Sequence, residues 1–406
     1  MHKTITVLLT VLALSLTADL SAKKAKEIIE TPASDSRIEY TGRTLVNGTE
    51  VSYDWSGVYF RVKFNGPYLA MKCSDTKNCW FNQWTDKEMS PKADKVFMVG
   101  AKDTVIVLAE GLGKGEHEVN LQKRTEGEQG RFTVHSFLSE GEILQADGRK
   151  DRHIEFIGDS YTCGYGTESP DRDDPFLAET ENCNLTYAAI ASRYFGADFN
   201  LVSHSGQGIC RNYDDYGQGY NMPDRYSQTF DESKEVIWNA SDAPYRPDLV
   251  VIYLCTNDFS TARQPHETIF AGRYIELLKK VKANYGADMP ILCLASNVTP
   301  FSFDYIRNAC MMSGLSNLTY VGLTKGIHNE TDELGASWHP NYKGHIKVAS
   351  SVIPYISTLT GWEMEEKPYK LIIYRQVGWK TKSLPLRGPL PFTGPWAATV
   401  FQPTCR

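Results

Sequence analysis

The sequence lacks the residue spacing that builds a structural zinc site. Its nine cysteines include no Cys-x-x-Cys pair, and no two of its nine histidines stand four residues apart. Tetrahedral zinc centres usually draw their ligands from such pairs, so we expect neither a metal nor another cofactor. An odd number of cysteines leaves at least one thiol unpaired within the chain. A bridge between Cys73 and Cys79 across a short loop is an alternative that the sequence leaves open.

The sequence also lacks a basic excess and a membrane-spanning run. Its net charge of −6 gives no support to binding of nucleic acid or of anionic membranes. The longest apolar run, Ile5–Leu16, is too short for a stable membrane anchor. Lys3 precedes this run and Ala18 and Ala22 follow it, which is typical of a signal peptide over residues 1–22. We therefore expect a secreted or periplasmic protein with no membrane anchor.

Residues 37–145 lack a helical pattern and alternate polar with apolar positions instead. The run Val58–Phe64 alternates strongly, and turn signals recur at residues 65–67 and 110–115. Many short strands separated by turns predict a β-sandwich of the jelly-roll type. The charged and polar residues 23–35 that precede it are predicted to be a linker.

The pattern changes after residue 151, where predicted strands alternate with predicted helices. The strands are expected at 199–202, 249–254, 291–295 and 319–323, and the helices at 186–195, 265–285, 303–312 and 341–359. This alternation predicts an α/β domain over residues 151–363 with a doubly wound parallel sheet. Residues 364–406 contain many prolines that break any regular element, and they are predicted to be an irregular C-terminal tail.

Polar residues follow the predicted strands of this α/β domain. Gly158-Asp159-Ser160 ends a strand-like run, Ser203–Gly208 follows the next run, and Asn257 follows the third. Trp338-His339 opens the last predicted helix. Because open α/β sheets bind ligands at the carboxyl ends of their strands, we expect these residues to lie near one another. The Gly-x-Ser-x-Gly elbow of α/β-hydrolases is absent, since Thr162 holds its last position.

These residue types suit the hydrolysis of an ester by a nucleophilic serine. A serine hydroxyl attacks well only when a base takes its proton, and histidine has a suitable pKa for that role. The attack creates an oxyanion, which prepositioned hydrogen-bond donors stabilise. Gly206 suits a backbone donor because no Cβ obstructs its approach, and Asn257 offers a neutral amide donor.

In this order, the four blocks resemble those of the SGNH (GDSL-type) hydrolases. The resemblance covers residues 152–362 and implies a flavodoxin-like parallel-sheet catalytic domain. It also implies that Ser160 is the nucleophile and His339 the general base. Gly206 and Asn257 would form the oxyanion hole together with the N–H of Ser160.

A β-sandwich placed before an SGNH-type domain is similar to the arrangement in carbohydrate esterase family 2, which includes the acetyl xylan esterases. Arg211-Asn212-Tyr213 and Gly344-His345 add to this resemblance. It implies removal of O-acetyl groups from plant polysaccharides such as xylan or mannan, through an acyl-enzyme on Ser160. Asn212, Tyr213 and Trp338 are predicted to contact the substrate. A lipid or thioester hydrolase on the same fold and a non-catalytic carbohydrate-binding protein are the alternatives.

One position departs from the general SGNH pattern. An aspartate normally stands three residues before the catalytic histidine, and here that position is Ala336. Some members of the resembled esterase family use a Ser–His dyad in which a backbone carbonyl orients the histidine. We therefore expect a carbonyl, that of Trp338 being the first candidate, to accept the Nδ1 hydrogen of His339. Asp332 and Glu333 are the nearest carboxylates in sequence, so a distant acid is the alternative.

Overall fold

The computed structural model describes residues 27–215, 219–261, 263–295, 301–323 and 331–364. The predicted signal peptide, residues 1–22, and the predicted tail beyond residue 364 lie outside these residues. In the part of the chain that the structure describes, every helix is too short or too polar to cross a membrane.

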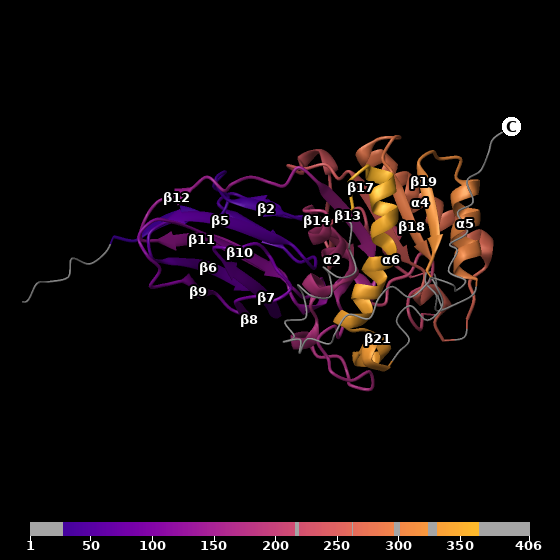
Figure 1. The fold of residues 1–406 in the computed structure, drawn as a ribbon, viewed down its shortest axis with the longest axis horizontal. Helices are drawn as coiled ribbons and strands as arrows, with labels where there is room; N and C mark the ends of the chain where they lie inside the picture. The colour runs from indigo at the N-terminus through magenta and orange to yellow at the C-terminus, as the bar shows by residue number, and fades with distance from the viewer. Residues whose placement is uncertain (1–26, 216–218, 262, 296–300, 324–330, 365–406) are drawn as a thin grey trace, which may run out of the picture. The chain divides into compact units, whose positions relative to one another are not determined.

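The N-terminal half of the described chain is built from two antiparallel sheets (Figure 1). The first has the order β3 (Leu45–Asn47), β4 (Glu50–Tyr53), β11 (Phe132–Ser139), β6 (Leu69–Asp75) and β9 (Thr104–Ala109), with β1 (Ile29–Pro32) beside β11. The second has the order β12 (Ile143–Leu144), β5 (Tyr59–Asn65), β10 (Glu116–Lys123), β7 (Asn78–Thr85) and β8 (Lys95–Gly100), with β2 (Glu39–Thr41) beside β5. The predicted β architecture is confirmed.

Strand β1 corrects the prediction that residues 23–35 are a linker, for the part from residue 27 on that the structure describes. Ile29 to Pro32 pair with Ser139 to Ser136 of β11 at the edge of the first sheet. Glu30 is exposed on this edge strand, and its carboxylate accepts hydrogen bonds from Lys72 and Ser136. Charged side chains are common on edge strands because they discourage pairing with other chains.

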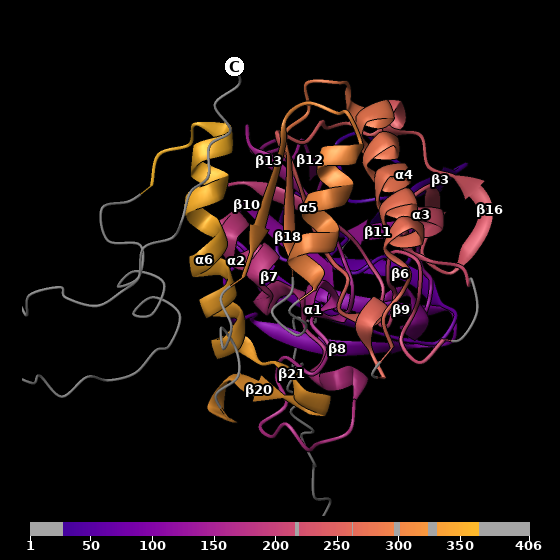
Figure 2. The same ribbon diagram turned by 90° about the vertical axis from the view of Figure 1, so that its right-hand side faces the viewer.

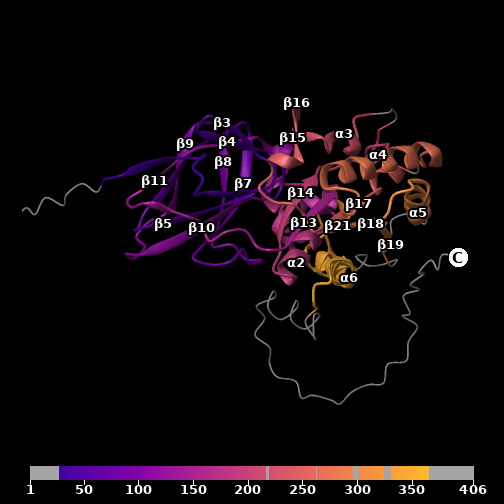
Figure 3. The same ribbon diagram turned by 90° about the horizontal axis from the view of Figure 1, so that it is seen from above.

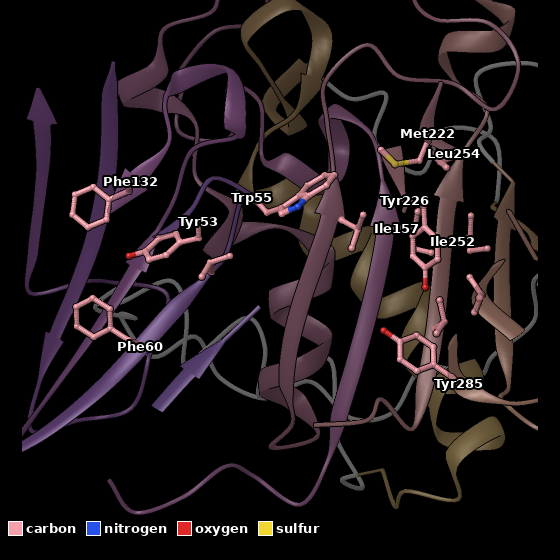
Figure 4. Close-up of a cluster of buried hydrophobic side chains, with 14 of the residues drawn as sticks. Tyr53, Trp55, Phe60, Phe132, Ile157, Met222, Tyr226, Ile252, Leu254 and Tyr285 are labelled. Atoms are coloured by element: carbon pink, nitrogen blue, oxygen red, sulfur yellow. The ribbon is translucent and has the colours of Figure 1, made fainter. Parts of the chain in front are cut away.

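Aromatic side chains fill the space between these two sheets. Tyr53, Phe60 and Phe132 are fully buried, and their rings belong to one continuous apolar core (Figure 4). Phe132 contacts Tyr53 and Phe81 with ring centroids 5.7 and 4.6 Å apart. Full burial of an aromatic side chain contributes roughly 1.5–3 kcal/mol, so this cluster is a major source of stability for the β-sandwich.

The C-terminal half contains a five-stranded parallel sheet. Its order is β14 (Asp198–Ser203), β13 (His153–Gly158), β17 (Leu249–Leu254), β18 (Ile291–Ala295) and β19 (Leu318–Gly322). This is the flavodoxin-like order, in which ligands bind where the strand order reverses, here between β13 and β17. All residues of β13, β14, β17 and β18 are buried, as expected for a parallel sheet covered on both faces.

Helices cover both faces of the parallel sheet (Figure 3). Helices α2 (Tyr187–Tyr194) and α6 (Tyr342–Thr360) pack together on one face, and α4 (Glu267–Tyr285) and α5 (Ser302–Met312) pack together on the other. The predicted helices and strands are confirmed, with ends that differ by one or two residues. The short helices α1 (Ser160–Cys163) and α3 (Met222–Arg225), the hairpin β15–β16 (Gln228–Phe230, Ser233–Ile237) and the pair β20–β21 (Leu334–Gly335, His339–Pro340) lie in the connections.

The described cysteines are all buried, and Cys73 and Cys79 are both free thiols. The loop bridge between these two residues, which the sequence left open, is therefore not formed. Cys79 instead places its Sγ 3.3 Å from Asp75 Oδ1 and 3.3 Å from the carbonyl of Gly130. Burial raises the pKa of Cys73 to about 12, which keeps that thiol protonated and unreactive.

Candidate active site

Ser160 stands at the first position of α1, directly after the end of β13. Asp159 caps this helix, since its Oδ1 accepts from the Tyr161 N–H at 3.1 Å. A Cβ on Gly158 would meet Thr162 Oγ1 at 1.9 Å, so only glycine fits where the chain turns so closely. The Ser160 N–H lies in the first turn of a helix, where backbone donors have no partner within the helix. The turn thus presents both the hydroxyl and the N–H of Ser160 at the sheet edge.

His339 lies on β21, which contacts α1 (Figure 2). Its Nε2 is 2.9 Å from Ser160 Oγ, and its Nδ1 is 3.0 Å from the carbonyl oxygen of Ser337. A carbonyl only accepts hydrogen bonds, so the Nδ1 atom carries the hydrogen and Nε2 is free to accept from the serine. The structure therefore aligns a serine hydroxyl with the basic nitrogen of a neutral imidazole.

The carbonyl that orients His339 is that of Ser337, so the expectation that Trp338 supplies it is wrong. Ser337 and Trp338 have φ values of 52° and 62°, both in the left-handed region. Two successive residues of this kind make a tight turn, which brings the Ser337 carbonyl back to the imidazole. The turn is held by the N–H groups of Ser337 and Trp338, which donate to the carbonyls of Asp174 and Arg172.

No described carboxylate contacts the Nδ1 side of His339. Ala336 is fully buried beside Gly166, so the usual aspartate position holds only a methyl group. Asp332 and Glu333 form ion pairs with Lys343 and Lys347 of α6 instead. Burial lowers the pKa of His339 to about 4, although the carbonyls of Ser337 and Ala336 favour the charged form.

Asn257 connects three of the four sequence blocks. It begins the 3-10 turn Asn257–Phe259 after β17, and the residue is 6% exposed. Its Nδ2 donates to the Gln207 carbonyl at 2.8 Å and lies 3.3 Å from Asp159 Oδ2. The amide group therefore joins the serine turn to the loop that carries Gly206.

Gly206 lies in the turn that follows β14 and has a φ of 75°. The Gly206 carbonyl accepts from the Tyr213 N–H at 2.8 Å. Among the described residues, no backbone carbonyl accepts from the Gly206 N–H. The left-handed φ favours glycine, and the free N–H fits a donor to a ligand. The structure thus places a potential second backbone donor one residue before the Gln207–Asn257 contact.

Asp258 was missed by reasoning from the sequence. Its carboxylate is fully buried and accepts from the N–H groups of Ile209, Cys210 and Arg211 at 2.8–3.1 Å. Burial raises the pKa of Asp258 to about 6, and the backbone donors counter this rise. Asp258 therefore fixes the path of the loop after Gly206. The only signal in the sequence was its place beside Asn257.

A pocket of about 430 Å³ opens above Ser160 and His339. Its lining residues are Ser160, Tyr161, Tyr213, Thr256, Asn257, Ser260, Thr261, Leu334, Ser337, Trp338 and His339. Two of them are exposed aromatic residues, Tyr213 at 63% and Trp338 at 55%. The Arg172 guanidinium lies over the Trp338 ring, 4.0 Å from its centre, in a cation–π contact. The pocket therefore combines reactive polar groups with accessible aromatic rings.

Asn212, which is predicted to contact the substrate, is not among the lining residues of this pocket. Its Oδ1 accepts from Asn221 Nδ2 at 2.8 Å and from the Gly208 N–H at 3.2 Å. Its Nδ2 donates to the Tyr220 carbonyl at 2.9 Å. All these partners belong to the connection between β14 and β17, so Asn212 braces that loop from within.

Comparison with known proteins gives matches over both halves of the chain. Residues 40–146 match the family described as carbohydrate esterase 2 N-terminal, and residues 156–346 match the GDSL-like lipase/acylhydrolase family. A solved structure of a family two carbohydrate esterase from Clostridium thermocellum, in complex with cellohexaose, is 30% identical with a TM-score of 0.73. The match covers 80% of this chain and 100% of that one.

Two curated proteins are similar over comparable lengths. The cellulase/esterase CelE of Acetivibrio thermocellus is 32% identical over 82% of this chain, and the matched region is 41% of CelE. An acetylxylan esterase/glucomannan deacetylase of Cellvibrio japonicus is 28% identical over 79% of this chain and 90% of its own length. The similarity thus extends across the β-sandwich and the parallel-sheet domain together.

Proposed function

Because the chain belongs to family 2 of the carbohydrate esterases, a family of carboxylic ester hydrolases, we propose that it removes O-acetyl groups from plant polysaccharides of the xylan or mannan type. The observation that carries this proposal is the 2.9 Å contact between Ser160 Oγ and His339 Nε2 within an open pocket. The Cellvibrio japonicus relative, named as an acetylxylan esterase and glucomannan deacetylase, supports the choice of substrate.

In the first half of the proposed reaction, His339 Nε2 takes the proton of Ser160 Oγ while this oxygen bonds to the acetyl carbon. The carbonyl oxygen becomes an oxyanion, which accepts hydrogen bonds from the N–H groups of Ser160 and Gly206 and from Asn257 Nδ2. The bond from the acetyl carbon to the sugar oxygen then breaks, and the sugar oxygen takes the proton from His339. The products of this half are acetyl-Ser160 and a free sugar hydroxyl.

The second half repeats the steps with water in place of the serine. His339 takes a proton from water, the hydroxide bonds to the acetyl carbon, and a second oxyanion forms in the same place. When this intermediate collapses, the bond from the acetyl carbon to Ser160 Oγ breaks, Oγ recovers the proton from His339, and acetic acid leaves and ionises to acetate in water. All the catalytic groups in these steps are side chains or backbone N–H groups of this chain, so we expect full activity after treatment with EDTA.

The two Nδ2 hydrogens of Asn257 differ in how readily each would leave its present acceptor for an oxyanion. The bond to the Gln207 carbonyl is 2.8 Å long, whereas the contact with Asp159 Oδ2 is 3.3 Å long and therefore weaker. We propose that the hydrogen facing Asp159 is the one that the oxyanion receives. The stronger bond then keeps the amide plane fixed during the reaction.

The rim of the pocket supports a carbohydrate substrate over a lipid. Tyr213 and Trp338 expose flat apolar rings beside the reactive groups, and such rings suit the faces of sugar residues. The Clostridium thermocellum neighbour was solved in complex with cellohexaose, which supports an oligosaccharide as the class of ligand. A protein that only binds carbohydrate would need neither a base aligned on a serine nor donors for an oxyanion.

A comparison of acyl chain lengths tests the proposal. The wild-type protein and Ser160→Ala are assayed on acetyl and octanoyl nitrophenyl esters, and acetate release is measured from acetylated xylan and glucomannan. We expect a preference for acetyl, release of acetate, and a loss of at least about a thousandfold in Ser160→Ala. Faster hydrolysis of the octanoyl ester would favour a lipid hydrolase, and no acetate release by the wild type would favour a binding protein.

We also propose that the protein acts outside the cytoplasm. Polymeric xylan and mannan do not enter cells, and residues 1–22 have the features of a signal peptide. Mass spectrometry of the exported protein should find an N-terminus close to residue 23. An N-terminus that retains residues 1–22 would contradict cleavage at this point.

A further inference from the structure

Strand β14 is held by the β-sandwich at both of its ends. At its first residue, Asp198 Oδ1 accepts from Arg61 at 2.6 Å and from the Tyr59 hydroxyl at 2.8 Å. Just beyond its last residue, Glu126 Oε2 accepts from the Ser205 N–H at 2.7 Å. Only the second contact lies at the carboxyl end of the sheet, where the candidate active site is.

Glu126 reaches this position from the connection between β10 and β11 and is 1% exposed. The same Oε2 atom lies 3.6 Å from Cys163 Sγ and 3.7 Å from His204 Nδ1. Cys163 ends the short helix that Ser160 begins, and Ser205 immediately precedes Gly206. A single carboxylate from the β-sandwich therefore contacts the turn of the proposed nucleophile and the turn of the proposed oxyanion donor.

The surrounding groups keep Glu126 in place. His204 Nδ1 lies 2.9 Å from Asp231 Oδ2, which also accepts from the Gly127 N–H at 3.2 Å. Burial alone would lower the pKa of His204, but the Asp231 carboxylate outweighs it and the pKa is raised to about 9. Glu181 Oε1 accepts from the Glu126 N–H at 3.0 Å. The carboxylate thus sits in a buried network that fixes its backbone and provides a nearby positive charge.

We propose that Glu126 is a positioning residue of the esterase, and that it sets the direction in which Gly206 presents its N–H to the oxyanion. This inference rests on the proposed function. Gly206 is conformationally free compared with other residues, so its orientation depends on bonds made by its neighbours. On one side Tyr213 holds its carbonyl, and on the other Glu126 holds the N–H of Ser205. Without the second bond, the His204–Ser205 peptide is free to rotate, and the next peptide, which carries the Gly206 N–H, loses one of the two anchors that flank it.

The expected effect is on the transition state more than on substrate binding. Removing one oxyanion donor outright costs about 10²–10³ in kcat, so a misdirected donor should cost about 10–100-fold. KM should change by less than about threefold, because the proposed oxyanion forms only during the reaction. The β-sandwich would then contribute to turnover through one hydrogen bond.

A matched set of variants separates this role from a general loss of stability. Glu126→Ala and Asp198→Ala each remove one buried carboxylate that joins the two halves at β14, at opposite ends of that strand. Kinetics on nitrophenyl acetate are measured well below the Tm of each variant. The inhibition constant of phenylboronic acid is measured under the same conditions, because this compound forms a tetrahedral adduct with the serine. We expect both variants to lower the Tm. Only Glu126→Ala should lower kcat by about 10–100-fold, and it should weaken the binding of phenylboronic acid by a similar factor.

Two further variants keep the test decisive if Glu126→Ala does not fold. Glu126→Gln retains an acceptor at the same reach, so its kcat should stay within about threefold of the wild-type value. Glu126→Asp retains the charge but cannot reach Ser205, so its kcat should fall by about tenfold or more. Equal kcat losses in Glu126→Ala and Asp198→Ala, or full kcat in Glu126→Asp, would overturn the positioning role. Ser160→Ala is run in parallel, because an active Ser160→Ala would instead refute the proposed function.

Discussion

The two halves of the described chain use their buried polar residues differently. In the parallel-sheet half, polar residues such as Ser160 and Asn257 stand just after buried strands and face a pocket. In the β-sandwich, several buried polar residues bond to the other half. Arg43 donates to the carbonyls of Tyr226 and Gln228 at 2.6 and 2.8 Å, and Glu126 accepts from Ser205. The parallel sheet thus carries the proposed chemistry, and the β-sandwich supports its geometry.

The largest expected effect tests whether the chemistry is confined to the parallel-sheet half. His339→Ala should reduce kcat about as severely as Ser160→Ala, by at least about a thousandfold, because the two residues act as one unit. The double variant should be no worse than either single variant. Circular dichroism and the Tm check that the fold is kept. A double variant with a much lower kcat than both single ones would mean that the residues act independently.

The location of the reactive residues was predictable because of the topology. The carboxyl ends of parallel strands meet at one edge, so Ser160, Asn257 and the loop of Gly206 had to converge. The carbonyl partner of His339 was not predictable in detail, since it depends on left-handed φ values at Ser337 and Trp338 that the residue types do not suggest. The contact made by Glu126 was not predictable either. Nothing in its own segment indicates that it meets a loop 79 residues later.

The next prediction concerns the junction between the halves. Trp55 is fully buried in the apolar core, between Tyr53 of the β-sandwich and Ile157 of the parallel sheet (Figure 4). Its Nε1 donates to the Thr229 carbonyl at 2.9 Å. Trp55→Ala should lower the free energy of unfolding by about 3–5 kcal/mol, while Trp55→Phe should lose roughly 1 kcal/mol with the hydrogen bond. Chemical denaturation followed by tryptophan fluorescence and circular dichroism measures both. Separate transitions for the two halves in the wild type would contradict a shared core.

The pH dependence of activity gives a smaller effect. His339 must be neutral to accept the proton of Ser160, and its pKa is lowered to about 4. An imidazole with the ordinary pKa of 6.5 would be about 97% protonated at pH 5 and would support little activity. We therefore expect kcat/KM on nitrophenyl acetate to stay nearly constant down to pH 5 and to fall as the pH approaches 4. An acid limb centred near pH 6.5 would show that the ring is better hydrated than the structure indicates.

The smallest expected effect tests whether any acid outside the turn assists His339. The Ser337 carbonyl orients the ring at 3.0 Å, and Asp332 and Glu333 are paired with lysines of α6. Asp332→Asn and Glu333→Gln should each change kcat by less than about tenfold, whereas loss of a true triad acid costs about 10⁴. Glu333 is buried, so Lys347→Met serves as its matched control for a lost ion pair. If kcat falls about a thousandfold in either carboxylate variant, while the kcat of Lys347→Met and the Tm are unchanged, a distant acid completes a triad.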